Sequence, residues 1–201
     1  MLSKYKYHIW LHATVLIFGL TGVLGKLITI DSYLLVWYRV GIAVVCLLAY
    51  FLFTKFSLKI DKKELYKILL VGVVIAVHWV TFFKAIKVSN VSVALVTMST
   101  GAFFASLIEP IFFKRRIKTL EIVLGLMVIG GLYIIFNFQS QYVMGIVYAL
   151  ISAFLSALFA VLNGLFIKKY DANVISFYQL LFGALSITLY LLFTQKFSVS
   201  F

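Results

Sequence analysis

The chain has 201 residues, of which 64% are hydrophobic and only 12% are charged. Soluble domains contain roughly 45–50% apolar and about 25% charged residues, so this composition excludes a soluble enzyme, a disordered chain and a collagen-like fibre. The single cysteine, Cys46, excludes a disulfide framework and a multi-cysteine metal site. We therefore expect an all-α integral membrane protein, built as a polytopic helix bundle.

Seven stretches are long and apolar enough to cross a bilayer, because about 20 residues of helix span the hydrocarbon core. In chain order they are Ile9–Ile30, Tyr33–Phe53, Leu65–Lys84, Val91–Phe113, Leu120–Phe138, Val143–Ile167 and Val174–Phe193. The connections between them are short, and none is long enough for a soluble domain. No small-x-small cleavage site follows the first stretch, so we expect a retained helix rather than a signal peptide.

The basic residues are distributed unevenly between the connections. With the N-terminus placed in the cytoplasm, 13 of the 18 Lys and Arg residues lie in cytoplasmic segments, and three (Lys84, Lys87 and Lys196) lie outside. Cytoplasmic loops of membrane proteins carry an excess of Lys and Arg. The net charge of +12 therefore predicts an orientation, with the N-terminus in the cytoplasm, and no nucleic-acid partner.

Two segments of the chain resemble each other at an offset of 140 residues. Residues 31–54 and 171–194 are identical at six of 24 aligned positions, among them Asp31 with Asp171 and Tyr50 with Tyr190. The turn at Asp31 is acidic and predicted to lie outside, whereas the turn at Lys168-Lys169-Asp171 is basic and predicted to lie inside. Five helices separate the copies, so the second copy is predicted to be inverted, as in many secondary transporters.

The repeat predicts the domain organisation. Residues 1–138 form a first five-helix repeat, and residues 143–201 begin a second, inverted repeat of which only two helices are present. On this interpretation the chain is truncated after the seventh helix. The alternative is a genuine seven-helix protein.

Several motifs resemble the EamA-type transporters of the drug/metabolite transporter superfamily. They are the runs Phe18–Lys26, Phe82–Val96, Ile108–Phe113 and Glu121–Gly131, together with the arginine at position 39. The resemblance implies ten helices in two inverted halves, in the plasma (inner) membrane, that export or exchange small metabolites. Two departures are the basic Lys114–Arg116 where the family usually has a glutamate, and Gly101 in a region that often holds a proline.

Ionisable residues inside a span are expensive, and therefore functional candidates. Lys26, Arg39 and His78 are predicted to form a cationic outer vestibule with Lys84 and Lys87 that attracts an anionic or zwitterionic substrate. The alternative is that the lysine and arginine extend to the interface and that the histidine is a buried, hydrogen-bonded residue. Further substrate candidates are Trp79 and Asn163, which could equally serve packing and helix–helix hydrogen bonding.

Glu109 and Pro110, near the inner end of the fourth span, are candidates for proton coupling or gating. An ion pair of this glutamate with Lys114 is the alternative. The sequence lacks dinucleotide-binding, Walker and nucleophile-elbow motifs, so we assign no catalytic residue, no cofactor and no metal ligand and expect a protein that is not an enzyme.

We therefore predict a secondary transporter of small metabolites, such as amino acids or other polar organic solutes, that works by alternating access in the lipid bilayer. A homodimer is left open. The alternatives are a seven-helix receptor or photoreceptor and a non-transporting scaffold. A receptor normally has its N-terminus outside, and a retinal protein needs a lysine in its seventh helix, which Val174–Phe193 lacks.

Overall fold

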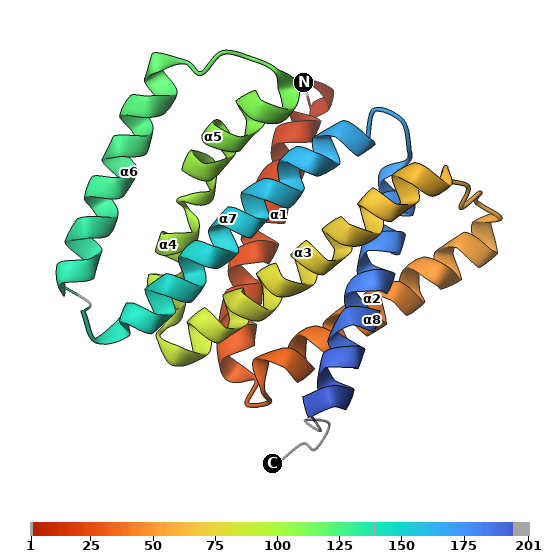
Figure 1. The fold of residues 1–201 in the computed structure, drawn as a ribbon, viewed down its shortest axis with the longest axis horizontal. Helices are drawn as coiled ribbons and strands as arrows, with labels where there is room; N and C mark the ends of the chain where they lie inside the picture. The colour runs from red at the N-terminus through yellow and green to blue at the C-terminus, as the bar shows by residue number, and fades with distance from the viewer. Residues whose placement is uncertain (1, 139, 195–201) are drawn as a thin grey trace.

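The structure is a computed structural model that describes residues 2–138 and 140–194. These residues form a bundle of α-helices with no strand (Figure 1). The helices are α1 (Leu2–Leu27), α2 (Ser32–Thr54), α3 (Lys62–Val88), α4 (Val91–Met98), α5 (Gly101–Phe113), α6 (Thr119–Phe138), α7 (Val143–Phe166) and α8 (Ala172–Thr194), with a 3₁₀ turn at Ser140–Tyr142. The predicted all-α bundle is confirmed.

Six segments of the described chain are long and apolar enough to span a membrane, and one of them is the pair α4 and α5 taken together, Val91–Phe113. The remaining predicted span corresponds to α6, which includes the apolar stretch Thr119–Ile134. Helix α6 lies at the edge of the bundle and packs mainly against α5 (Figure 1). Most of its side chains are exposed, as expected of a helix that faces lipid.

The fourth span is not the continuous helix that its sequence predicts. At Ser99 and Thr100 the backbone N–H groups bond to the carbonyls three residues earlier, at 3.2 and 3.1 Å. The hydroxyls of both residues donate to the same two carbonyls, each at 2.7 Å. Hydroxyl side chains that bond to nearby backbone compete with helical hydrogen bonds, which explains a break that hydropathy does not register.

Helix α3 is the centre of the fold and packs along both α7 and α8. Its contact with α8 is a backbone-to-backbone approach at Gly72. A Cβ atom there would clash with the carbonyl oxygen of Gln179, and one at Gly183 would lie 3.0 Å from the carbonyl oxygen of Gly72. Small residues let membrane helices approach closely, so these two glycines fix the distance between α3 and α8.

Helices α2 and α8 lie antiparallel. Tyr33, at the start of α2, stacks on Tyr190 near the end of α8 with 4.6 Å between ring centroids. Phe51, near the end of α2, packs edge-on against Phe177 near the start of α8. Between these pairs the indole N–H of Trp37 donates to the hydroxyl of Thr188 at 2.8 Å.

The same two helices have equivalent local structure. Each has 23 residues, and their first residues, Ser32 and Ala172, are 140 positions apart. Each is preceded by an aspartate whose carboxylate accepts a hydrogen bond from the N–H two residues later: Asp31 from Tyr33 at 2.9 Å and Asp171 from Asn173 at 2.8 Å. The sequence similarity therefore coincides with identical helix length and identical capping.

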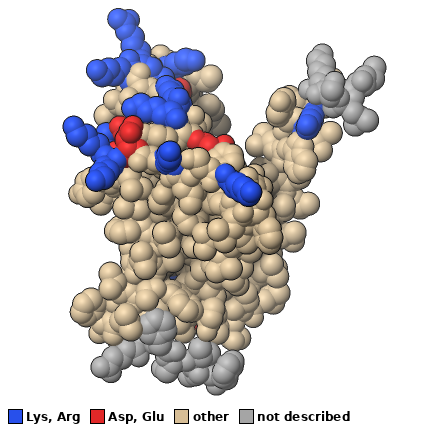
Figure 2. Space-filling view, turned by 90° about the vertical axis from the view of Figure 1, so that its right-hand side faces the viewer, with Lys and Arg blue, Asp and Glu red and all other residues tan. Residues whose placement is uncertain are grey.

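Basic residues gather at one end of the bundle, which we call the basic end (Figure 2). Three connections meet there: α2–α3, α5–α6 and α7–α8. Tyr170 donates to the carboxylate of Asp61 at 2.9 Å, Lys169 pairs with Glu64 at 3.4 Å, and the ammonium of Lys168 lies 4.6 Å from the centroid of the Phe113 ring. The three connections that were assigned to one side of the membrane from their Lys and Arg residues therefore lie at one end of the bundle.

Candidate functional site

A cavity of about 580 Å³ lies where α1, α2, α3 and α4 meet α7. Polar and aromatic side chains line it, with apolar residues of α1 and α4 completing the wall. The polar and aromatic members are Phe18, Thr21, Arg39, His78, Trp79, Phe82, Ser156 and Phe159. We call it the Arg39 cavity. It brings together three of the residues that the sequence singled out: Arg39, His78 and Trp79.

The guanidinium of Arg39 faces aromatic rings instead of a carboxylate. Its central carbon lies 4.6 Å from the ring centroid of Trp79 and 5.6 Å from that of Phe83. Among the residues that the structure describes, none accepts a hydrogen bond from it or forms an ion pair with it. Stacking on aromatic faces orients the guanidinium and leaves its N–H donors available, which suits it to hold an anion such as a carboxylate.

His78 is 7% exposed and is anchored to α7 through Ser152. Its Nδ1 lies 2.9 Å from the carbonyl oxygen and 2.9 Å from the hydroxyl oxygen of that serine. The serine hydroxyl in turn donates to the carbonyl of His78 at 3.0 Å. Because Nδ1 is engaged with α7, Nε2 is the ring nitrogen that remains for a bound solute.

Lys26, also predicted for the vestibule, does not line the Arg39 cavity. Its ammonium donates to the carbonyls of Ile86 and Ser89, each at 3.1 Å, at the end of α3. Lys87 behaves in the same way toward the end of α1, where it donates to the carbonyls of Ile28 and Ile30. These lysines satisfy carbonyls in the last turn of α3 and in the residues that follow α1 and α3, and so join the α1–α2 turn to the α3–α4 turn.

Asn163 also lies away from the cavity. Its side chain exchanges two hydrogen bonds with Gln179 of α8, at 2.6 and 3.4 Å. Gln179 is only 2% exposed, so the amide pair satisfies polar groups between α7 and α8. The structure thus gives this asparagine a contact between helices.

Glu109 pairs with Arg115 at 3.1 Å, and not with Lys114, the partner considered from sequence. Arg115 also pairs with Glu121 at 3.0 Å, so one guanidinium joins the end of α5 to the start of α6. These contacts raise the pKa of Arg115, with Glu121 contributing more than Glu109. Pro110, next to the glutamate, is buried inside α5. Neither residue reaches the Arg39 cavity.

Sequence reasoning missed the residues that α7 and α4 contribute to the cavity. Ser156 and Phe159 of α7 line it, as does Met98, which immediately precedes the break in the fourth span. Serine, phenylalanine and methionine are common in any membrane helix, so no pattern distinguishes these three. Among the described residues, no group of three or more His, Cys, Asp or Glu side chains could hold a metal ion.

Comparison with known proteins identifies the family. The model of the EamA-like transporter family, part of the drug/metabolite transporter superfamily, matches residues 5–137, more than half of the chain. Searches of curated proteins and of solved structures found no significant match. The family is one of multi-pass membrane transporters, whose partners are the lipid bilayer and a small-molecule substrate. The chain therefore belongs to the EamA-like transporter family.

Proposed function

We propose that this protein transports a small anionic or zwitterionic organic solute, such as an amino acid or another carboxylate, and binds it in the Arg39 cavity. The observation that carries the proposal is the guanidinium of Arg39, stacked on Trp79 without a carboxylate partner among the described residues. A charged group in a membrane helix is expensive, and a substrate anion would offset that cost. The aromatic walls fit the organic part of the solute.

The proposal includes alternating access between two inverted repeats, residues 1–138 and the segment that begins at residue 143. The equal length and capping of α2 and α8 and their antiparallel packing support it. The cavity lies between α1–α4 and Ser156 and Phe159 of α7, the first helix of the second repeat. Substrate sites between inverted repeats, next to an interrupted helix, are common in secondary transporters.

We propose that the protein lies in the plasma (inner) membrane. Its basic end and its N-terminus then face the cytoplasm. The asymmetry of Lys and Arg between the two ends supports it. The Arg39 cavity then lies on the path between a cytoplasmic end bounded by the α2–α3 turn and an outer end bounded by the α1–α2 turn.

Solute counterflow in liposomes tests the function. We expect exchange of radiolabelled amino acids or aromatic carboxylates, and none of an uncharged sugar. Arg39→Gln should weaken apparent affinity about 10- to 100-fold, because it removes a charge-assisted hydrogen bond. Arg39→Lys should retain part of the affinity, and Lys59→Gln, in the exposed α2–α3 connection, is the charge-matched control. Sugar exchange that Arg39→Gln leaves unchanged would contradict the proposal.

A further inference from the structure

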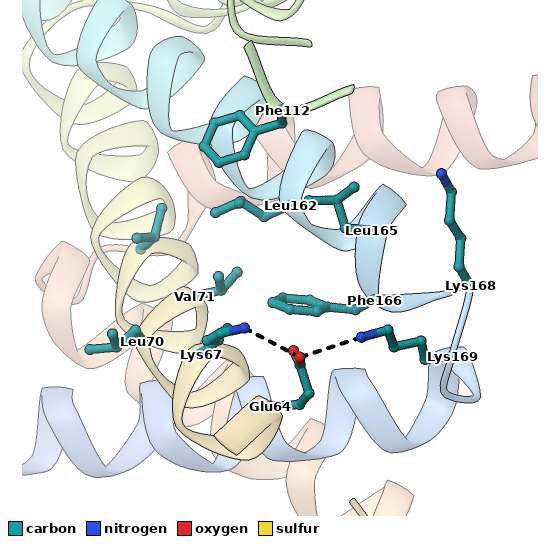
Figure 3. A pocket seen from close by; sticks show the side chains of 11 residues that line it. Glu64, Lys67, Leu70, Val71, Phe112, Leu162, Leu165, Phe166, Lys168 and Lys169 are labelled. Carbon is teal, nitrogen blue, oxygen red and sulfur yellow. Dashed lines mark hydrogen bonds and ion pairs between the residues drawn. The ribbon is translucent and has the colours of Figure 1, made fainter. Parts of the chain in front are cut away.

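A second cavity, of about 630 Å³, opens at the basic end between α3, α5 and α7 (Figure 3). We call it the basic groove. Its deep part is apolar and includes Val71 and Val74 of α3 with Leu162 and Phe166 of α7. No residue that lines it also lines the Arg39 cavity in the described chain. The basic groove is therefore separate from the proposed transport site.

Charged side chains lie only at the mouth of the basic groove. Glu64 accepts from Lys67 at 3.2 Å and from Lys169 at 3.4 Å, and Figure 3 shows its carboxylate between the two ammonium groups. Lys168 adds a third cation. One carboxylate against three ammonium groups leaves two net positive charges at the mouth. The side chains of Lys67 and Lys169 are 59% and 63% exposed, so both are accessible to a further anion.

The groove changes from charged to apolar along the direction of the helices. On α3, Lys67 is followed by Val71 and Val74, a distance of about 10 Å along the axis. On the antiparallel α7, Leu162 and Phe166 precede the lysines of the α7–α8 turn. The polar end lies with the other basic residues and the apolar end lies toward the middle of the bundle. This polarity matches a molecule with an anionic head and a hydrocarbon chain.

We propose that the basic groove binds an anionic phospholipid of the leaflet that faces the basic end. The phosphate lies beside Lys67 and Lys169, Lys168 adds positive charge from the other side of the mouth, and one acyl chain lies against Val74 and Leu162. Basic pockets between membrane helices attract anionic headgroups, and each lysine near the surface contributes to that attraction. A free anion would leave the apolar walls empty, and a zwitterionic lipid would gain little from the excess positive charge.

Native mass spectrometry of the purified chain tests the proposal with two lipids that share dioleoyl chains, phosphatidylglycerol and phosphatidylcholine. We expect preferential retention of phosphatidylglycerol. Lys168→Gln with Lys169→Gln should reduce its occupancy about fivefold for each lysine removed. The matched control is Lys62→Gln with Lys63→Gln, which removes the same charge from exposed positions at the same end without altering the groove lining.

A third variant tests the apolar end. Val74→Trp fills the space for the acyl chain and should reduce retention of phosphatidylglycerol while the melting temperature confirms that the variant is folded. Equal retention of the two lipids, or equal losses in the control and the Lys168/Lys169 variant, would overturn the proposal. Displacement of the lipid by inorganic phosphate alone, or a lipid-free dimer that Val74→Trp dissociates, would overturn it as well.

Discussion

The guanidinium carbon of Arg39 lies 4.6 Å from the ring centroid of Trp79, and this stacking joins α2 to α3 at the edge of the Arg39 cavity. Guanidinium groups are weakly hydrated and stack on indole rings, so the pair tolerates a partly buried setting without a carboxylate. The charge therefore remains available to a solute. Substitutions near the cavity can therefore distinguish residues that bind a solute from residues that hold the helices together.

His78 is predicted to act mainly on stability. Replacing it with leucine removes the donor to the Ser152 carbonyl and should lower the melting temperature, whereas His78→Asn keeps an N–H donor and should lower it less. Ser152→Ala should cost about 1 kcal/mol, because the hydroxyl loses its bond to the His78 carbonyl. Thermal unfolding in detergent measures all three. An unchanged melting temperature for His78→Leu would rule out this role.

Gly72 is predicted to be essential for the contact between α3 and α8. An alanine there would clash with the carbonyl of Gln179, so Gly72→Ala should lower the free energy of unfolding by about 1–3 kcal/mol. Gly41→Ala is the matched control, since a Cβ at Gly41 meets no atom within 4 Å. The control should be neutral or stabilising because alanine favours helix. Equal melting temperatures for the two variants would show that the close approach is absent.

A substitution at Thr97 is predicted to raise the stability of the protein, whereas His78→Leu and Gly72→Ala are predicted to lower it. Its hydroxyl is fully buried beside the break in the fourth span and has no hydrogen-bond partner among the described residues. Thr97→Val replaces that hydroxyl with a methyl group of similar size and should stabilise the protein by about 1 kcal/mol. A lower melting temperature would instead show that the hydroxyl has a partner in the functional protein.

The orientation is testable through the single cysteine. In a Cys46→Ala background, Ser57→Cys puts a thiol in the α2–α3 connection at the basic end, and Gln141→Cys puts one in the 3₁₀ turn before α7. A membrane-impermeant maleimide added to intact cells should label position 141 and should label position 57 only after permeabilisation. The background alone should not be labelled. The reverse pattern would contradict a cytoplasmic basic end.

Hydropathy was sufficient to predict the apolar segments, because each is a long apolar run bounded by polar turns. It did not predict every helix end, since α1 begins at Leu2, seven residues before the predicted Ile9. The predicted end of the sixth span, Ile167, is one residue beyond the observed end of α7 at Phe166. The sequence does not predict the break at Ser99 and Thr100, because serine and threonine also occur in unbroken helices. The break depends on which backbone carbonyl accepts the hydrogen bond of each hydroxyl.

The site was harder to predict, because it depends on contacts between distant parts of the sequence. Charge alone made Lys26 and Arg39 equivalent candidates, yet the lysine reaches carbonyls at the end of α3 while the arginine stacks on Trp79. Asn163 finds its partner 16 residues away, on the next helix, where no local pattern indicates it. The sequence identifies polar residues in apolar helices, and helix packing determines which of them remain available to a solute.

Tryptophan fluorescence of the purified chain tests the central claim most directly, because Trp79 is one of three tryptophans and the one that lines the cavity. Titration with aromatic carboxylates and amino acids should give a saturable change that Trp79→Phe removes and that Arg39→Gln shifts to about 10- to 100-fold higher concentration. The amides of the same compounds, which lack the carboxylate, should give no change. Equal responses to acids and amides, or a response unaffected by Arg39→Gln, would contradict binding of an anion in the Arg39 cavity.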